Sequence, residues 1–167
     1  RWQFLKNILK HRKPNNEEST EKWVMPIVYA CMNLARSKTG ALIVVQQDVP
    51  LDNYEKTGDI INANINSRLL ENIFFKNSPL HDGAVIIADN LIKSAGCILP
   101  VSHDTTIPRS LGLRHRSALG IAQDTDAVAI VVSEETGYIS VAHKGALHTK
   151  LTSTELEHTL SQLSSEV

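Results

Sequence analysis

Two short polar clusters in this sequence contain the residue types that hold metal ions and phosphates. The first is the segment 79–84 (PLHDGA), where His81 and Asp82 stand side by side just before an apolar run. An imidazole and a carboxylate together can bind a divalent cation, or one of them can act as a base. Gly83 lets a ligand approach the backbone closely. The alternative is a polar turn that contains His and Asp without a chemical role.

The second cluster is the segment 112–117 (GLRHRS), which lies at a predicted helix start. A helix N-terminus presents free backbone amides and the positive end of the helix dipole, so it favours phosphate. Arg114 and Arg116 add charge-assisted donors suited to phosphate oxygens. Two positive side chains at the positive end of the helix dipole are unfavourable unless an anion offsets their charge. This local conflict indicates an anion site. A solvated basic turn is the alternative.

A third segment, 132–137 (VSEETG), places acidic residues in a hairpin turn. Such residues are usually solvated, but a glutamate in a turn folded over a phosphate site can serve a metal or orient a water molecule. The chain has no Walker loop, GxGxxG fingerprint, Ser/His/Asp triad or CxxC pair. Cys31 and Cys97 lie in separate apolar segments and are interpreted as reduced core residues of a cytosolic protein.

Composition places the chain among ordinary globular domains. Its 167 residues are 42% hydrophobic and 21% charged, with a formal net charge of -1. This length suits one domain with its own core, and the composition excludes disorder as the dominant state. Since no global charge attracts a polyanion, we expect no nucleic-acid partner. The sequence contains no run of about 18 apolar residues, so it predicts no membrane-spanning helix.

Hydrophobic spacing predicts the elements that must position these clusters. Apolar residues at intervals of three and four predict helices over 20–38, with Pro26 in the first turn or at a kink, and over 65–74. A short helix is expected over 114–124, and a capping box at Thr152 and Glu155 begins a final helix. The predicted strands, from short apolar runs, are 41–45, 84–88, 91–99, 127–132 and 138–143.

The order of these elements predicts one α/β domain, with a mixed, mostly antiparallel sheet flanked by helices. Asp89 and Asn90 form the expected hairpin turn, whereas 48–58 is turn-rich and 100–113 is a long connection. Residues 1–10 are basic with interleaved apolar side chains. They indicate either a segment at a membrane surface or an amphipathic start that packs on the domain. We therefore expect a juxtamembrane or linker segment at 1–19 and a folded domain at 20–167.

Taken together, the clusters and their flanking blocks resemble the catalytic domain of the diadenylate cyclase family, from about Trp23 to Lys144. The two signatures of that family, Asp-Gly-Ala and Arg-His-Arg, stand here at 82–84 and 114–116. This chain has Leu113 where the family commonly has Thr, and Ile98 where relatives often have an aromatic residue. A hydroxyl contact and adenine stacking are therefore not carried over to these positions. The resembling blocks are 40–44, 69–74, 78–87, 99–102, 111–120 and 133–137.

The resemblance implies that two ATP molecules are condensed into cyclic di-AMP, with release of two pyrophosphates. The 3′-hydroxyl of each ATP attacks the α-phosphate of the other, so the two-fold symmetric product implies a face-to-face homodimer. By resemblance, Asp82 activates the hydroxyl, His81 and Asp82 hold Mn²⁺ or Mg²⁺, and the two arginines hold the triphosphate. The remaining ATP contacts implied by the resemblance are Gly83, Ala84, Leu99, His115, Ser117 and Glu135.

The resemblance also has implications for location and partners. The basic, aromatic start fits the membrane-anchored subclass, so we expect the full-length protein at the cytoplasmic face of the cell membrane and this fragment to be soluble. Members of that subclass are associated with a membrane-linked regulator and with phosphoglucosamine mutase. Two rival interpretations remain open. One is a catalytically inactive nucleotide-binding sensor of the same fold, and the other is an interaction module whose Arg-His-Arg docks an acidic or phosphorylated partner.

Overall fold

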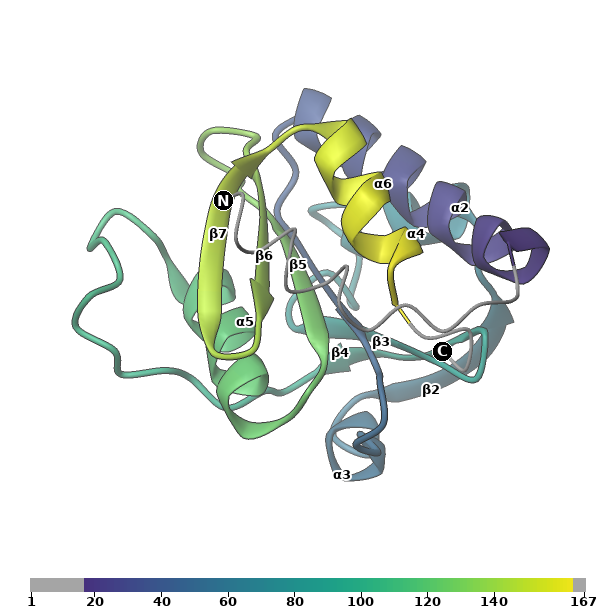
Figure 1. Cartoon of the computed structure of the whole chain (residues 1–167), viewed down its shortest axis with the longest axis horizontal. Helices are drawn as coiled ribbons and strands as arrows, with labels where there is room; N and C mark the ends of the chain where they lie inside the picture. The colour runs from purple at the N-terminus through teal and green to yellow at the C-terminus, as the bar shows by residue number, and fades with distance from the viewer. Residues whose placement is uncertain (1–16, 164–167) are drawn as a thin grey trace.

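The structure is a computed structural model, and it describes residues 17–163 (Figure 1). The elements are α2 (Glu17–Arg36), β1 (Ala41–Val45), α3 (Asp52–Glu55), β2 (Asp59–Asn64), α4 (Ser67–Phe74), β3 (Ala84–Ala88), β4 (Leu91–Cys97), α5 (Leu113–Asp124), β5 (Val128–Val132), β6 (Ile139–His143), β7 (Ala146–Leu151) and α6 (Ser153–Ser161). Helices and strands alternate from α2 to β3, whereas β3 and β4, and β5 to β7, follow one another directly, with a long connection of residues 98–112 before α5.

The strands form one seven-stranded sheet in the order β2-β4-β3-β1-β5-β6-β7. Only the β1–β3 pair within this sheet is parallel, and the other five pairs are antiparallel. The predicted mixed, mostly antiparallel sheet is therefore confirmed. The β3–β4 hairpin turns at Asp89 and Asn90, whose φ angles of 52° and 58° are those that a type I′ turn requires.

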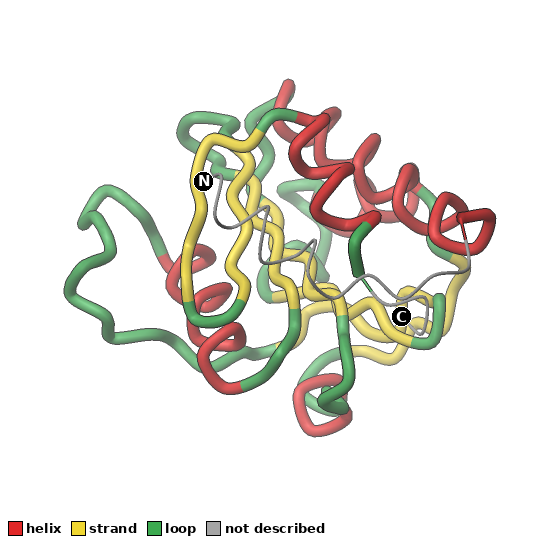
Figure 2. Tube along the Cα trace, viewed as in Figure 1, coloured by secondary structure: helices red, strands yellow, loops and turns green. Residues whose placement is uncertain are grey.

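Helices cover both faces of the sheet. Successive residues of a strand point to opposite faces, so Ile43 joins the cluster under α2, α4 and α6, while Leu42 and Val44 join the cluster under α5. Figures 1 and 2 show α2, α4 and α6 on one side of the sheet and α5 on the other. Since β1, β3 and β5 are buried on both faces, their sequences are continuous apolar runs without alternation.

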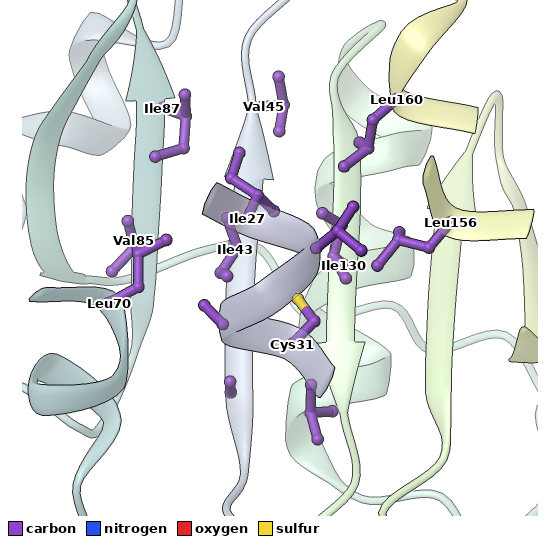
Figure 3. Close-up of a cluster of buried hydrophobic side chains, with 14 of the residues drawn as sticks. Ile27, Cys31, Ile43, Val45, Leu70, Val85, Ile87, Ile130, Leu156 and Leu160 are labelled. Atoms are coloured by element: carbon purple, nitrogen blue, oxygen red, sulfur yellow. The ribbon is translucent and has the colours of Figure 1, made fainter. Parts of the chain in front are cut away.

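The larger core cluster lies between the sheet and α2. Figure 3 shows the helix segment with Ile27 and Cys31 in front of the central strands that carry Ile43 and Ile130, with Leu156 of α6 to one side. Burial of such aliphatic side chains contributes roughly 1.5–3 kcal/mol each. Burial also raises the pKa of the Cys31 thiol to about 12, so it is a packing residue, as its apolar setting predicts.

Three elements were not predicted, and each has a weak apolar pattern. The edge strand β2 (DIINAN) is half-buried at best, and its pairing with β4 shifts between Ile60 and Ala63. The other edge strand, β7 (ALHTKL), is mostly exposed before Leu151. The short helix α3 lies within the turn-rich segment 48–58. Edge strands bury only part of one face and need no apolar run, so the sequence signal is lost.

The first helix differs from its predicted bounds. It begins at Glu17 rather than at residue 20 and ends at Arg36 rather than at residue 38, and Pro26 stands inside it, beyond the first turn. The basic segment 1–10 and most of the expected linker lie outside the described residues. Within 17–163, no helix has both the length and the apolar character needed to cross a membrane. The division at residue 19 remains a prediction.

Candidate active site

The two clusters meet at one edge of the sheet because of strand direction. β3 runs parallel to β1, and β5 runs antiparallel to it with Val132 opposite Ala41. The starts of β1 and β3 and the end of β5 therefore lie at the same edge, beside the start of α5. A cleft of about 200 Å³ opens there. Six residues predicted from the sequence line it: Asp82, Gly83, Arg114, His115, Ser117 and Glu135.

The backbone before β3 is held by close packing at Gly83. Its φ of +98° favours glycine, and a Cβ there would lie 2.7 Å from the Cys97 carbonyl oxygen. The contact is made on β4 at a bulge, where Gly96 has a φ of +66° and the pairing with β3 shifts. This packing fixes the segment that presents the exposed Asp82 carboxylate to the cleft.

His81 is fixed by the turn that precedes Asp82. Its ring Nδ1 lies 2.7 Å from the Ser78 carbonyl oxygen, which also accepts the His81 backbone N–H at 3.2 Å. A ring held by a carbonyl through one nitrogen presents the other as a lone-pair donor, which suits metal ligation. His81 is half-buried, but the cleft lining does not include it.

The carboxylates suit a hard divalent cation but do not enclose one. Asp82, Glu134 and Glu135 line the cleft, and oxygen donors of this kind fit Mg²⁺ or Mn²⁺. Within 17–163, no three His, Cys, Asp or Glu side chains gather closely enough to hold a metal by themselves. The residues present therefore fit a cation that takes much of its shell from phosphate and water, as Mg²⁺ does.

Arg114 is the main cationic group of the cleft. Its guanidinium lies over Gly40, where an added Cβ would be 2.7 Å from Arg114 Cζ. Its Nη1 pairs with Glu134 Oε2 at 3.5 Å, while its Nε is buried and has no hydrogen-bond acceptor in the described part of the chain. A buried N–H without an acceptor is costly, and an anion in the cleft would supply one.

The start of α5 adds further polar groups to the cleft. Gly112 is the N-cap residue and provides no side-chain cap, so the first backbone amides remain free for an anion. Ser117 lies three residues after Arg114 and therefore on the same side of the helix. Burial and the charge of Arg114 lower the pKa of His115 against the opposing effect of Glu135, which favours the neutral imidazole.

Four predicted residues do not line the cleft. His81 is held in its turn, and Ala84 and Leu99 are buried in the core cluster under α5. Arg116 lies two positions after Arg114, about 200° around the helix, and its Nη1 lies 3.5 Å from the Asp104 carbonyl oxygen. The structure thus brings together one arginine of the Arg-His-Arg signature with the aspartate of the other signature. The ATP contacts themselves remain predictions.

Several cleft features were missed by sequence reasoning. Glu134 had a signal, because it stands next to the predicted Glu135, but its pairing with Arg114 depends on the fold. The contact of Gly40 with Arg114 had no sequence signal. Of the two departures from the family pattern, Leu113 lines the cleft and is 67% exposed, while Ile98 is 70% exposed and donates its backbone N–H to Thr57 Oγ1 at 2.8 Å.

Comparison with known proteins gives consistent matches. The family model DAC, described as the DisA bacterial checkpoint controller nucleotide-binding domain, matches residues 28–147. The chain is 45% identical over 144 residues to the cyclic di-AMP synthase CdaA of Bacillus subtilis, covering 86% of this chain and 53% of that protein. It is 50% identical over 127 residues to a diadenylate cyclase of Listeria monocytogenes, covering 76% of this chain and 46% of that protein.

Solved structures agree with the fold. The crystal structure of DacA from Staphylococcus aureus superposes with a TM-score of 0.84 at 40% identity, covering 86% of this chain and 95% of that one. A structure of a hypothetical membrane spanning protein from Bacillus cereus gives a TM-score of 0.76 at 40% identity, covering 89% and 69%. The chain spans about half the length of the two curated relatives described above.

Proposed function

The chain belongs to the DAC family, and we propose that it is a diadenylate cyclase, condensing two ATP into cyclic di-AMP with release of two pyrophosphates. One observation carries this proposal. The Asp-Gly-Ala and Arg-His-Arg signatures are some thirty residues apart in sequence, yet Asp82 and Arg114 line one cleft. A carboxylate that can accept a proton and a guanidinium that can hold phosphate are the two groups that nucleotidyl transfer needs.

The phosphate side of the cleft consists of Arg114 and the first turn of α5. The unpartnered Nε of Arg114 and the free amides after Gly112 are donors already in place for the triphosphate. Donors fixed before substrate binds need no reorganisation as charge develops on the leaving pyrophosphate. Ser117 and His115, whose neutral form is favoured by burial, contribute hydrogen bonds.

Asp82 is the candidate general base that deprotonates the 3′-hydroxyl. Its carboxylate is exposed in the cleft, on a backbone fixed by Gly83. Asp82 and His81 would hold Mn²⁺ or Mg²⁺, with the Glu134 and Glu135 carboxylates as further oxygen donors. When bound, such a cation neutralises phosphate charge and acidifies a bound hydroxyl. Asp82 would orient and deprotonate the hydroxyl that attacks the α-phosphorus.

Ring closure requires two nucleotides in opposed orientation. The product has two-fold symmetry, and the cleft of one domain has a single set of phosphate-binding groups. The simplest catalyst is therefore a C2 homodimer with the two clefts facing each other. Most of the acceleration would come from holding each 3′-hydroxyl in line with the opposite α-phosphate.

The test is direct product analysis. Purified protein is incubated with ATP and Mn²⁺ or Mg²⁺, and cyclic di-AMP is measured by chromatography over a range of protein concentrations. We expect product formation, with turnover per domain rising with concentration. ATP binding without product would favour the inactive sensor of the same fold. If ATP and metal give no thermal stabilisation, the docking-module interpretation is favoured and nucleotide binding is rejected.

Location and partners extend the same proposal. The similar Bacillus cereus structure is described as a hypothetical membrane spanning protein, which supports a membrane tether, and we place the full-length protein at the cytoplasmic face of the membrane. A membrane-linked regulator and phosphoglucosamine mutase are the proposed partners. Fractionation of cells expressing the full-length protein tests the tether, since recovery in the cytosolic fraction would contradict it. Co-purification of each partner with the full-length protein tests the contacts.

A further inference from the structure

Arg116 contacts the long connection between β4 and α5 with both its backbone and its side chain. Its backbone carbonyl oxygen accepts the N–H of Ser102 at 2.9 Å, and its Nη1 lies 3.5 Å from the carbonyl oxygen of Asp104. The helix face that carries Arg116 also carries Gly120, four residues later. A Cβ at Gly120 would lie 2.7 Å from the Pro100 carbonyl carbon, so this face of α5 is pressed against the connection.

The first half of the connection has an internal framework that Arg116 supports. Ser102 is buried, and its Oγ accepts the N–H of Asp104 at 3.2 Å. The Asp104 carboxylate accepts both the N–H and the hydroxyl of Thr106, at 2.8 and 2.7 Å. These hydrogen bonds, with the charge of Arg116, lower the pKa of Asp104. The next residue, Ile107, is buried and anchors the chain again.

The second half of the connection leads into the cleft. Residues 108–110 are exposed, and a turn there is closed by the Leu111 N–H donating to the Pro108 carbonyl oxygen at 3.0 Å. Ser110 and Gly112 then line the cleft. Figure 1 shows this connection running outward from the body of the domain before it returns to α5. Its path to the cleft therefore depends on contacts at its base.

We propose that Arg116 is a positioning residue, which holds the connection 98–112 in place so that Ser110 and Gly112 keep their places in the cleft. Within one domain, Arg114 contacts the nucleotide and Arg116 holds the wall beside it. The two arginines of the signature therefore have different roles, because residues two positions apart point to different sides of α5. One test of this inference, nucleotide binding, rests on the proposed function. The other test, proteolysis of the connection, does not.

The test compares Arg116→Gln with Arg114→Gln in two measurements. The first is limited trypsin digestion at the exposed Arg109–Ser110 bond, followed by mass spectrometry. Removing one charge-assisted hydrogen bond should increase cleavage about tenfold in Arg116→Gln, whereas Arg114→Gln should stay within about twofold of the unchanged protein. The Arg116→Lys variant keeps a cationic donor for the carbonyl and should cleave nearly as slowly as the unchanged protein.

The second measurement is the Kd for AMP and for ATP by calorimetry. A displaced cleft wall weakens both nucleotides by a similar factor, whereas a lost ligand to the β- or γ-phosphate weakens ATP alone. Faster cleavage with matched weakening of AMP and ATP supports the proposal. Unchanged cleavage, a loss confined to ATP, or faster cleavage with unchanged binding would each overturn it. If the unchanged protein binds neither nucleotide, the proposed function fails, and the cleavage comparison still decides the loop contact.

Discussion

The guanidinium of Arg114 lies so close to Gly40 that a methyl group at position 40 would meet it, with Cβ 2.7 Å from Cζ and 3.2 Å from Nε. Gly40 stands just before β1, and Arg114 stands in the first turn of α5, so residues distant in sequence share one contact at the edge of the sheet. The glycine creates the space in which the cation of the cleft lies. Its role is therefore steric, because its side chain must be absent.

Gly40→Ala should lower kcat/KM by roughly 10- to 100-fold by displacing Arg114, since hydrogen bonds to charged groups are each worth about 1.5–3 kcal/mol. The control is the same substitution in an Arg114→Ala background, where it should have almost no further effect. Independent, additive losses in the double variant would contradict the relationship. Thermal unfolding of all three variants separates displacement of Arg114 from loss of the fold.

Asp82→Asn should reduce cyclic di-AMP formation by roughly 100-fold or more, the contribution typical of a positioned base. The Kd for ATP should change little, because phosphate binding is assigned to Arg114 and α5. Asp89→Asn is the matched control: it changes an exposed aspartate at the other end of β3, where φ is 52° and asparagine is well tolerated. Unreduced turnover in Asp82→Asn would remove this carboxylate from the mechanism.

The central elements and the site motifs were predictable from sequence because their signals are local. β1, β3 and β5 are continuous apolar runs, and the Thr152–Glu155 capping box is reciprocal, with hydrogen bonds of 3.1 Å in each direction. The edge strands β2 and β7 were not predictable, since their pairing partners and not their own residues define them. The contact of Gly40 with Arg114 was not predictable for the same reason, because it exists only once the chain has folded.

The orientation of Arg116 is a different case, because a usable signal was present. Residues 114 and 116 of one helix cannot face the same point, and Gly120 stands one turn after Arg116. The helical spacing was thus sufficient to separate the two arginines, but the family signature favoured treating them as a pair. A predicted motif is therefore better read together with the periodicity of the element that carries it.

Glu134→Gln should strengthen the binding of AMP without metal by roughly two- to fivefold, because the carboxylate that pairs with Arg114 at 3.5 Å is removed. Unfolding free energy should change by less than about 1 kcal/mol, since the Glu134 side chain is 63% exposed. Glu135→Gln, from the same turn, is the matched control and should have a smaller effect on AMP. Equal strengthening by both substitutions would show a general charge effect and not the specific ion pair.

Acid should destabilise the fold through His143, which is buried at the end of β6. Burial and the charge of Lys144 lower the pKa of His143 to about 4, against the opposing effect of Asp126. The unfolded chain, with an ordinary histidine pKa of about 6.5, therefore binds a proton first as pH falls. This contribution is fully present above about pH 6.5 and is lost progressively as pH falls toward 4, up to roughly 3 kcal/mol.

Urea unfolding at pH 7, 6 and 5 measures this loss, which should reach about 2 kcal/mol between the ends of that range if His143 acts alone. His143→Gln should be less stable at pH 7 but should show a flatter dependence on pH, because the titrating group has gone. The matched control is His103→Gln, which changes an exposed histidine on the connection before α5 and should leave the slope unaltered. A slope unchanged in His143→Gln would assign the acid sensitivity to other groups, of which buried His115 shifts in the same direction.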